Sequence, residues 1–278
     1  MNSTILVFTV LGCVHLADAA AAPDTKEIVK RAIGRELENH RNLANYTWQT
    51  RSVTAIKGSD TKSKTYENFN IDGTSYRKLI EKDNRPLPEA DARDEQAKMD
   101  REIRKRRAES PSQRARRVAE QQKEREEGIR FRNDVLQAFD FALEGEENIG
   151  KFKAWRIRAD QRAAFKPSSR DGRHLNKVKG RIWVDQGSGE WLKFEMETTD
   201  KITWGAFIAS VAPGSRIVAQ QMRVNDELWH PQWIKVVANA RALWKHWDAT
   251  IDVAYQNFRK FQTDSKLIAA TPLPSRVP

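Results

Sequence analysis

Histidines, cysteine and neighbouring carboxylates are the residues here that could bind a metal ion or transfer a proton, yet they form no recognisable site. Glu144, Glu146 and Glu147 flank Gly145, where a solvated turn at a strand end explains them better than an acid–base pair. Neither a nucleophile elbow nor a phosphate-binding glycine loop is present. The five histidines share no metal-ligand spacing: His15, His40, His174, His230 and His246. We therefore predict no enzymatic activity, cofactor or metal ion, with a hydrolase of unrecognised site as the lesser alternative.

The single cysteine, Cys13, lies in an apolar segment at the start of the chain. Residues 5–16 are almost wholly apolar, and the small residues at 17–22 suit a signal peptidase. The apolar run is shorter than the roughly 20 residues that a membrane-spanning helix needs. We predict that residues 1–22 are a signal peptide and that the protein is exported to the periplasm or cell envelope. Because Val10-Leu11-Gly12-Cys13 resembles a lipobox, lipidation of Cys13 is the alternative to cleavage after the alanines.

Positive charge is the strongest feature of the composition. The chain has 49 Lys and Arg against 38 Asp and Glu, a net charge of +11. Such a balance favours acidic partners, and outside the cytoplasm an anionic membrane surface is the most available one. Charged residues of both signs crowd into residues 86–128, where aliphatic residues are almost absent, and the positive excess lies mainly at residues 101–117. The side chains expected to contact an anionic surface or an envelope protein are Arg104, Lys105, Arg106, Arg107, Arg114, Arg116 and Arg117.

This charged segment has alternative interpretations. Its acidic residues are interspersed at spacings that form pairs within a helix, which favours a solvated helical hairpin without a binding role. Docking on an anionic membrane or a protein is the second interpretation. Nucleic acid is not an expected partner, because no aromatic residue lies among the charges from residue 84 to 129. Ser110-Pro111-Ser112-Gln113 has the form of a capping box, so two solvated, mobile helices should meet near Ser110.

A helix and a meander open the exported chain. Asp24 is a candidate N-cap with Glu27 three residues later, and apolar residues recur on one helical face from Thr25 to Leu43. Beyond Tyr46 the apolar period changes to two, with turn signals near residues 57–60 and 72–73. We therefore predict a helix over residues 25–43 and then three antiparallel strands.

The second half of the chain alternates in the manner of strands, most clearly at residues 191–197 and 249–256. Short strands with one apolar face predict an antiparallel sheet with helices on one side. Trp191 and Trp233 are out of phase with their neighbours and should lie on the other face. Residues 201–212 are either a strand across a cavity mouth or an ordinary buried segment. The residues predicted to line an apolar cavity are Trp48, Leu192, Phe194, Met196, Ile234, Val236, Ile251 and Val253.

The order of these elements resembles a known family. A helix, a meander and a helical insertion precede the strand Gly180-Arg181-Ile182-Trp183-Val184-Asp185 and a hairpin into Glu190-Trp191-Leu192-Lys193-Phe194-Glu195. Together with Val224-Asn225-Asp226-Glu227-Leu228-Trp229-His230-Pro231, these motifs resemble the bacterial periplasmic lipoprotein-carrier fold of LolA/LolB-like, outer-membrane lipoprotein-sorting proteins. The resemblance covers residues 25–261, and each motif is short.

The resemblance implies an α+β fold in which a strongly curved antiparallel β-sheet, an open half-barrel, carries helices on its concave side. Residues 23–261 would form one domain with the charged helical insertion at 86–128, followed by a disordered tail at 262–278. The family binds lipid in an apolar cavity without catalytic residues. The implied function is binding of a lipid, or of a lipoprotein acyl chain, in the cell envelope. The alternative is an envelope scaffold protein whose charged arm binds a partner.

Overall fold

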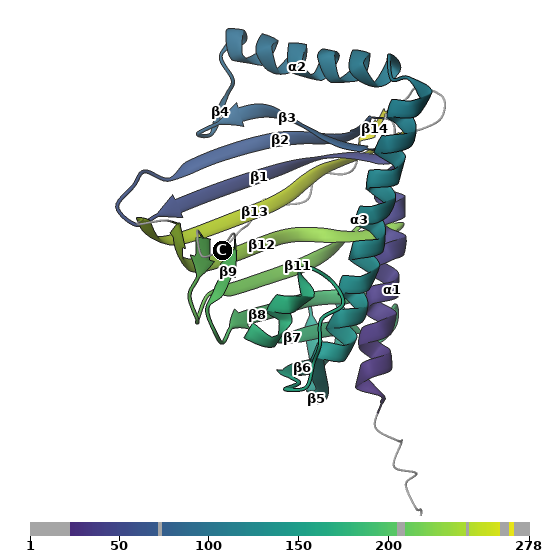
Figure 1. Cartoon of the computed structure of the whole chain (residues 1–278), viewed down its shortest axis with the longest axis vertical. Coiled ribbons are helices and arrows are strands. Elements are labelled where there is room, and N and C mark those ends of the chain that lie inside the picture. The colour runs from purple at the N-terminus through teal and green to yellow at the C-terminus, as the bar shows by residue number, and fades with distance from the viewer. Residues whose placement is uncertain (1–22, 72–73, 205–208, 243–244, 262–266, 270–278) are drawn as a thin grey trace, which may run out of the picture.

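A computed structural model describes residues 23–71, 74–204, 209–242, 245–261 and 267–269 (Figure 1). The predicted signal peptide with Cys13 lies outside these residues. The helices are α1 (Thr25–Leu43), α2 (Glu89–Arg107), α3 (Pro111–Ala138) and the 3-10 helix η1 (Gly172–Lys177). The strands are β1 (Tyr46–Ile56), β2 (Lys62–Ile71), β3 (Thr74–Lys82), β4 (Arg85–Pro86), β5 (Phe139–Ile149), β6 (Phe152–Gln161), β7 (Val178–Asp185), β8 (Trp191–Thr198), β9 (Ile202–Trp204), β10 (Ala209–Val211), β11 (Arg216–Val224), β12 (Leu228–Ala242), β13 (Lys245–Phe261) and β14 (Leu267–Ala269).

All the strands belong to one antiparallel sheet. Its main path runs β4-β3-β2-β1-β13-β12-β11-β8-β7-β6-β5, while β9 pairs with β10, β10 with β12, and β14 with β13. The end strands β4 and β5 do not pair with each other, so the sheet stays open in the described part of the chain, and Figure 1 shows its curvature. The predicted α+β fold with an open, curved antiparallel sheet is confirmed. Strand β14 lies within the segment predicted to be a disordered tail, whose other residues lie outside the described ones.

Helix α1 has the predicted bounds and packs on one face of the sheet. Asp24 caps it by accepting hydrogen bonds from the backbone N–H groups of Lys26 at 3.0 Å and Glu27 at 3.3 Å. Burial of an aliphatic side chain stabilises a protein by about 1.5–3 kcal/mol, so the apolar stripe of α1 holds it firmly. We call the covered face the inner face. The buried cluster comprises Ile28, Val29, Ala32, Ile157, Val184, Trp191 and Ala219.

Helix α3 runs beside α1 across the strands and continues ten residues past Gly128, where the predicted charged insertion ends (Figure 1). Phe131, Val135 and Ala138 on its last turns pack with an apolar cluster beneath them. These contacts explain the extension, because they give the otherwise charged helix an apolar face to bury. The carboxyl half of α3 is therefore part of the domain core.

A buried carboxylate fastens α3 to the loop before η1. Asp134 is 1% exposed and accepts hydrogen bonds from the backbone N–H and hydroxyl groups of both Ser168 and Ser169. Gly172 passes so close that a Cβ there would overlap Oδ2 of Asp134. Burial raises the pKa of Asp134, but the hydrogen bonds from Ser169 and Ser168 outweigh it and hold the pKa below its ordinary value.

Helix α2 lies along strand β3 near the edge of the sheet (Figure 1). The backbone N–H of Leu79 donates to the Glu95 carboxylate at 3.4 Å, and Nζ of Lys78 donates to Oε1 of Gln96 at 2.6 Å. The Glu95 side chain of α2 thus accepts from one backbone N–H of an edge strand, where backbone groups have no strand partner on one side.

Candidate functional site

Strand register brings six of the eight predicted cavity residues into two adjacent rows on the inner face. In the first row, neighbours across β8, β11, β12 and β13 are Met196, Ile217, Val236 and Ile251. In the second row they are Phe194, Ala219, Ile234 and Val253. We call these eight residues the apolar rows. Because pairing of each strand with the next is continuous, side chains distant in sequence form one surface.

One end of the apolar rows is covered and the other is open. Phe194 and Ile234 pack against the cluster under α1, and Met196 packs against the cluster under α3. In contrast, four aliphatic side chains are only half-buried and, among the described residues, join none of the clusters beneath the helices: Ile217, Val236, Ile251 and Val253. The open end is an apolar surface that the described helices leave uncovered.

Leu192 lies outside the apolar rows because β8 carries a bulge. Trp183 pairs with Lys193 and Val184 with Trp191, so Leu192 has no partner of its own across β7. The bulge turns Trp191 to the inner face, with its ring 5.3 Å from that of Phe194, while Leu192 is buried in a separate cluster. The predictions that Leu192 shares the face of Phe194 and that Trp191 lies opposite are therefore wrong, since strict alternation fails at a bulge.

Trp48 lies in an aromatic group around a buried histidine. The His230 ring is 5.8 Å from the Trp48 ring, 4.8 Å from that of Tyr255 and 5.0 Å from that of Phe258. Nδ1 of His230 lies 2.9 Å from the carbonyl oxygen of Pro231, which only accepts, so Nδ1 is the protonated nitrogen. Burial lowers the pKa of His230 to about 4. The sequence alone could not reveal this group, because the aromatic neighbours of His230 lie on two other strands, β1 and β13.

The basic side chains predicted to meet a partner divide into two groups. Arg106 donates to Glu102 at 2.7 Å, and Arg117 forms an ion pair with Glu109 at 2.8 Å, so these two stabilise the corner between α2 and α3. The helices meet near Ser110, whose capping box with Gln113 is confirmed. The other five predicted contacts are exposed: Arg104, Lys105, Arg107, Arg114 and Arg116.

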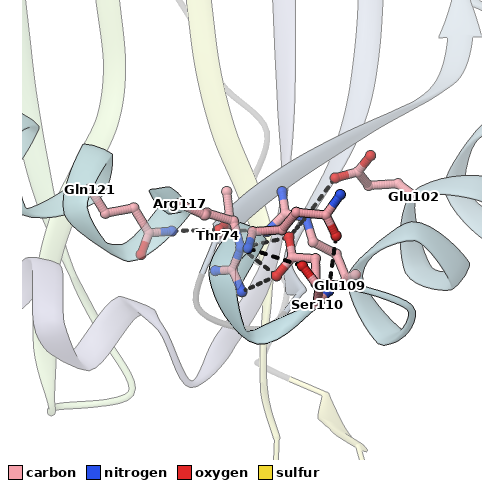
Figure 2. Close-up of polar contacts among 8 residues, drawn as sticks. Thr74, Glu102, Glu109, Ser110, Arg117 and Gln121 are labelled. Carbon is pink, nitrogen blue, oxygen red and sulfur yellow. Dashed lines mark hydrogen bonds and ion pairs between the residues drawn. The ribbon is translucent and has the colours of Figure 1, made fainter. Parts of the chain in front are cut away.

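Hydrogen bonds tie this corner to the sheet, a contact that the sequence did not predict. Figure 2 shows Thr74, at the start of β3, beside the ion pairs of the corner. Its Oγ1 accepts hydrogen bonds from Nη1 of Arg106 at 2.9 Å and from Nε2 of Gln121 at 2.7 Å. One hydroxyl thus holds both helices to the same strand.

Replacing Thr74 with valine should loosen the corner. Valine keeps the branched shape but lacks the oxygen that accepts from Arg106 and Gln121, which costs about 1–2 kcal/mol of local stability. Hydrogen–deuterium exchange should then be roughly tenfold faster in residues 104–121. Ser75→Ala, at the exposed neighbouring position, is the control. Equal protection in the two variants would show that Thr74 does not hold the corner.

The carboxylates of β5 form ion pairs and do not resemble an acid–base site. Glu144 accepts from Arg181 at 2.8 Å and lies 3.2 Å from Arg156, beside an open outer-face pocket of about 610 Å³. The hydrogen bond from Arg181 holds the pKa of Glu144 below its ordinary value, and a bond from Lys153 does the same for Glu146. Carboxylates held ionised in this way are unsuited to donate a proton. Within the described residues, no three His, Cys, Asp or Glu side chains are grouped to hold a metal ion.

The segment at 201–212 contributes two short strands beside the end of β12. Ser210 of β10 pairs with Arg241 of β12 and with Thr203 of β9, so the segment extends the sheet. Residues 205–208 between the two strands lie outside the described ones. Whether the segment also borders a cavity stays a prediction.

Several solved structures are similar in fold to this chain. No family model and no curated protein matches the sequence. Similar structures include a DUF1329 family protein from Desulfovibrio piger, with 11% identity, 87% of this chain and 95% of that chain covered, and a TM-score of 0.37. A LolA superfamily protein from Nitrosomonas europaea has 10% identity, 87% and 94% coverage and a TM-score of 0.35. An outer membrane lipoprotein-sorting protein domain from Vibrio parahaemolyticus has 8% identity, 86% and 95% coverage and a TM-score of 0.36.

The second and third structures bear the description of the family that the sequence motifs resemble. At these identities the likeness concerns the fold alone. Separately, none of the helices in the described residues has the length and apolarity needed to cross a membrane.

Proposed function

We propose that this protein is a non-enzymatic, exported protein of the cell envelope that binds the acyl chain of a lipid or lipoprotein along the apolar rows. The open end of these rows supports the proposal, because its four aliphatic side chains lie together on adjacent strands and no helix of the described residues covers them. Exposed apolar surface costs about 25 cal/mol per Å², and a bound hydrocarbon chain removes it from water.

The composition of the apolar rows favours hydrocarbon over a polar ligand. All eight residues are apolar and carry no hydrogen-bonding side chain, so a sugar or nucleotide would lose its bonds to water without replacement. The rows continue onto β1 at Ser52 and Thr54, which pair with Val253 and Ile251. These hydroxyls mark the polar end of the surface, where the head group of an acyl ligand would lie.

Replacing Val236 with aspartate should weaken acyl binding by about 10- to 100-fold. Each buried CH2 of an acyl chain contributes about 0.8 kcal/mol, and a carboxylate in the middle of the rows keeps water against two or three of them. Titration of the purified protein with a fluorescent long-chain fatty acid measures the change. Native mass spectrometry of protein isolated from its own envelope would show whether a lipid is carried.

Val237→Asp is the matched control, because Val237 is 45% exposed and lies on the opposite face one residue further along β12. It should bind the probe as the unchanged protein does. If both variants bind equally well, or if the unchanged protein has no affinity for acyl probes, the apolar rows are not a lipid site.

A further inference from the structure

The corner between α2 and α3 concentrates positive charge. Residues 101–117 include eight basic and two acidic residues, a net charge of +6, against +11 for the whole chain. Both acidic side chains are engaged inside the corner, Glu102 with Arg106 and Glu109 with Arg117. The six other basic side chains are exposed and, among the described residues, form no ion pair: Arg101, Arg104, Lys105, Arg107, Arg114 and Arg116.

An apolar groove lies beside these charges. It has a volume of about 410 Å³ and is lined by Pro111, Ala115 and Val118 together with the Glu109 and Arg114 side chains. Val118 is 52% exposed and is one of the few aliphatic residues in this charged segment, so its side chain provides apolar surface beside the cations. An apolar surface bordered by cations suits the boundary between phospholipid head groups and acyl chains.

The corner also presents its charges in a fixed position. The Thr74 hydroxyl holds Arg106 of α2 and Gln121 of α3 to the start of β3. Figure 2 shows Gln121 beside Thr74. Two helices that are already ordered lose less conformational entropy on binding than a flexible basic tail would.

We propose that this corner docks the protein on an anionic phospholipid bilayer. Six uncompensated cations attract phosphate-bearing lipids, and the groove around Val118 accepts the apolar boundary beneath the head groups. Single-stranded nucleic acid would be expected to use aromatic side chains for base stacking, and residues 84–129 contain none. The proposal goes beyond acyl binding because it assigns a second surface that acts on the membrane.

A triple variant, Arg104→Ala, Lys105→Ala and Arg107→Ala, tests the proposal by vesicle flotation. The unchanged protein should bind phosphatidylglycerol-containing vesicles, bind pure phosphatidylcholine vesicles weakly, and lose binding as ionic strength rises about tenfold. The triple variant should bind the anionic vesicles roughly 100-fold more weakly, since each cation near an anionic surface contributes several-fold. Circular dichroism and titration with the fluorescent fatty acid, without vesicles, check that fold and acyl binding persist.

The matched control removes the same charge elsewhere, at three exposed lysines outside both the corner and the apolar rows: Lys26→Ala, Lys57→Ala and Lys166→Ala. It should keep most vesicle binding. Equal loss of vesicle binding in both triple variants would show that only the net charge of the protein matters. Binding to heparin or an acidic polypeptide, without binding to vesicles, would assign the corner to another partner. Either result overturns the proposal. Loss of acyl binding in Val236→Asp with vesicle binding retained separates the two surfaces.

Discussion

Replacing Asp134 with alanine is expected to lower the free energy of unfolding by about 3–5 kcal/mol, the usual cost of removing one partner from a buried, charged hydrogen-bond network. The Asp134 carboxylate accepts from two backbone N–H groups and two hydroxyls of Ser168 and Ser169. Alanine leaves the Ser169 donors buried without an acceptor, because Ser169 is itself buried. Chemical denaturation monitored by tryptophan fluorescence measures the change.

Asp94→Ala provides the control for this prediction, because Asp94 is an exposed helical aspartate on α2 and its loss should change stability by less than about 0.5 kcal/mol. Gly172→Ala offers an independent test of the same site, since its new methyl group would collide with the Asp134 carboxylate. If both Asp134→Ala and Gly172→Ala unfold at the denaturant concentration of the unchanged protein, Asp134 does not hold α3 to the loop before η1.

Acidification from pH 6.5 to pH 4 should remove about 3 kcal/mol of stability through His230 alone. The folded protein keeps this 9% exposed imidazole neutral, with a pKa lowered to about 4, whereas the unfolded chain takes up a proton at the ordinary value of 6.5. Between these two values the unfolded state binds more protons, so stability falls as pH falls. Each unit of difference corresponds to about 1.4 kcal/mol.

The His230 contribution is read as the difference between the unchanged protein and His230→Phe. Phenylalanine retains the aromatic contacts with Trp48, Tyr255 and Phe258 but cannot be protonated. Subtraction is needed because Glu190 acts in the opposite direction. Burial raises the pKa of Glu190 more than the hydrogen bond from Asn39 lowers it. The folded protein therefore binds a proton at Glu190 more readily than the unfolded chain, and this contribution to stability rises as pH falls. The exposed His246, replaced by phenylalanine, is the control. A His230→Phe profile parallel to that of the unchanged protein would contradict the assignment.

Periodicity was sufficient to predict the elements that have one apolar face and no interruption. The helix at residues 25–43 follows from a capping aspartate and a helical repeat, and both are local properties. Six residues of the apolar rows follow from alternation in β8, β12 and β13, and antiparallel register then aligns them with Ile217 and Ala219 of β11. In these cases the pattern within each segment already fixes which side chains face the core.

The features that could not be predicted depend on partners remote in sequence. Leu192 does not lie with the predicted cavity residues, because a bulge on β8 interrupts the alternation. The sequence of residues 191–197 contains no signal that predicts this bulge. Arg106 and Arg117 belong to the same basic run as Arg104, and only the folded corner shows that two of them are neutralised. Asp134 is matched by serines 34 and 35 residues away. Long-range pairing of this kind leaves no local signal.

The placement of α2 along β3 makes the charged arm difficult to treat as a detachable module. Excising it would free the edge strand whose Leu79 amide now donates to Glu95, and an uncovered edge is a template for chain-to-chain pairing and aggregation. We therefore expect excision of the arm to lower solubility, and a change of its surface charges to leave solubility unchanged. A deletion variant that aggregates would fail to bind for that reason alone. Single charge changes at the corner leave the edge strand covered, so they test binding directly.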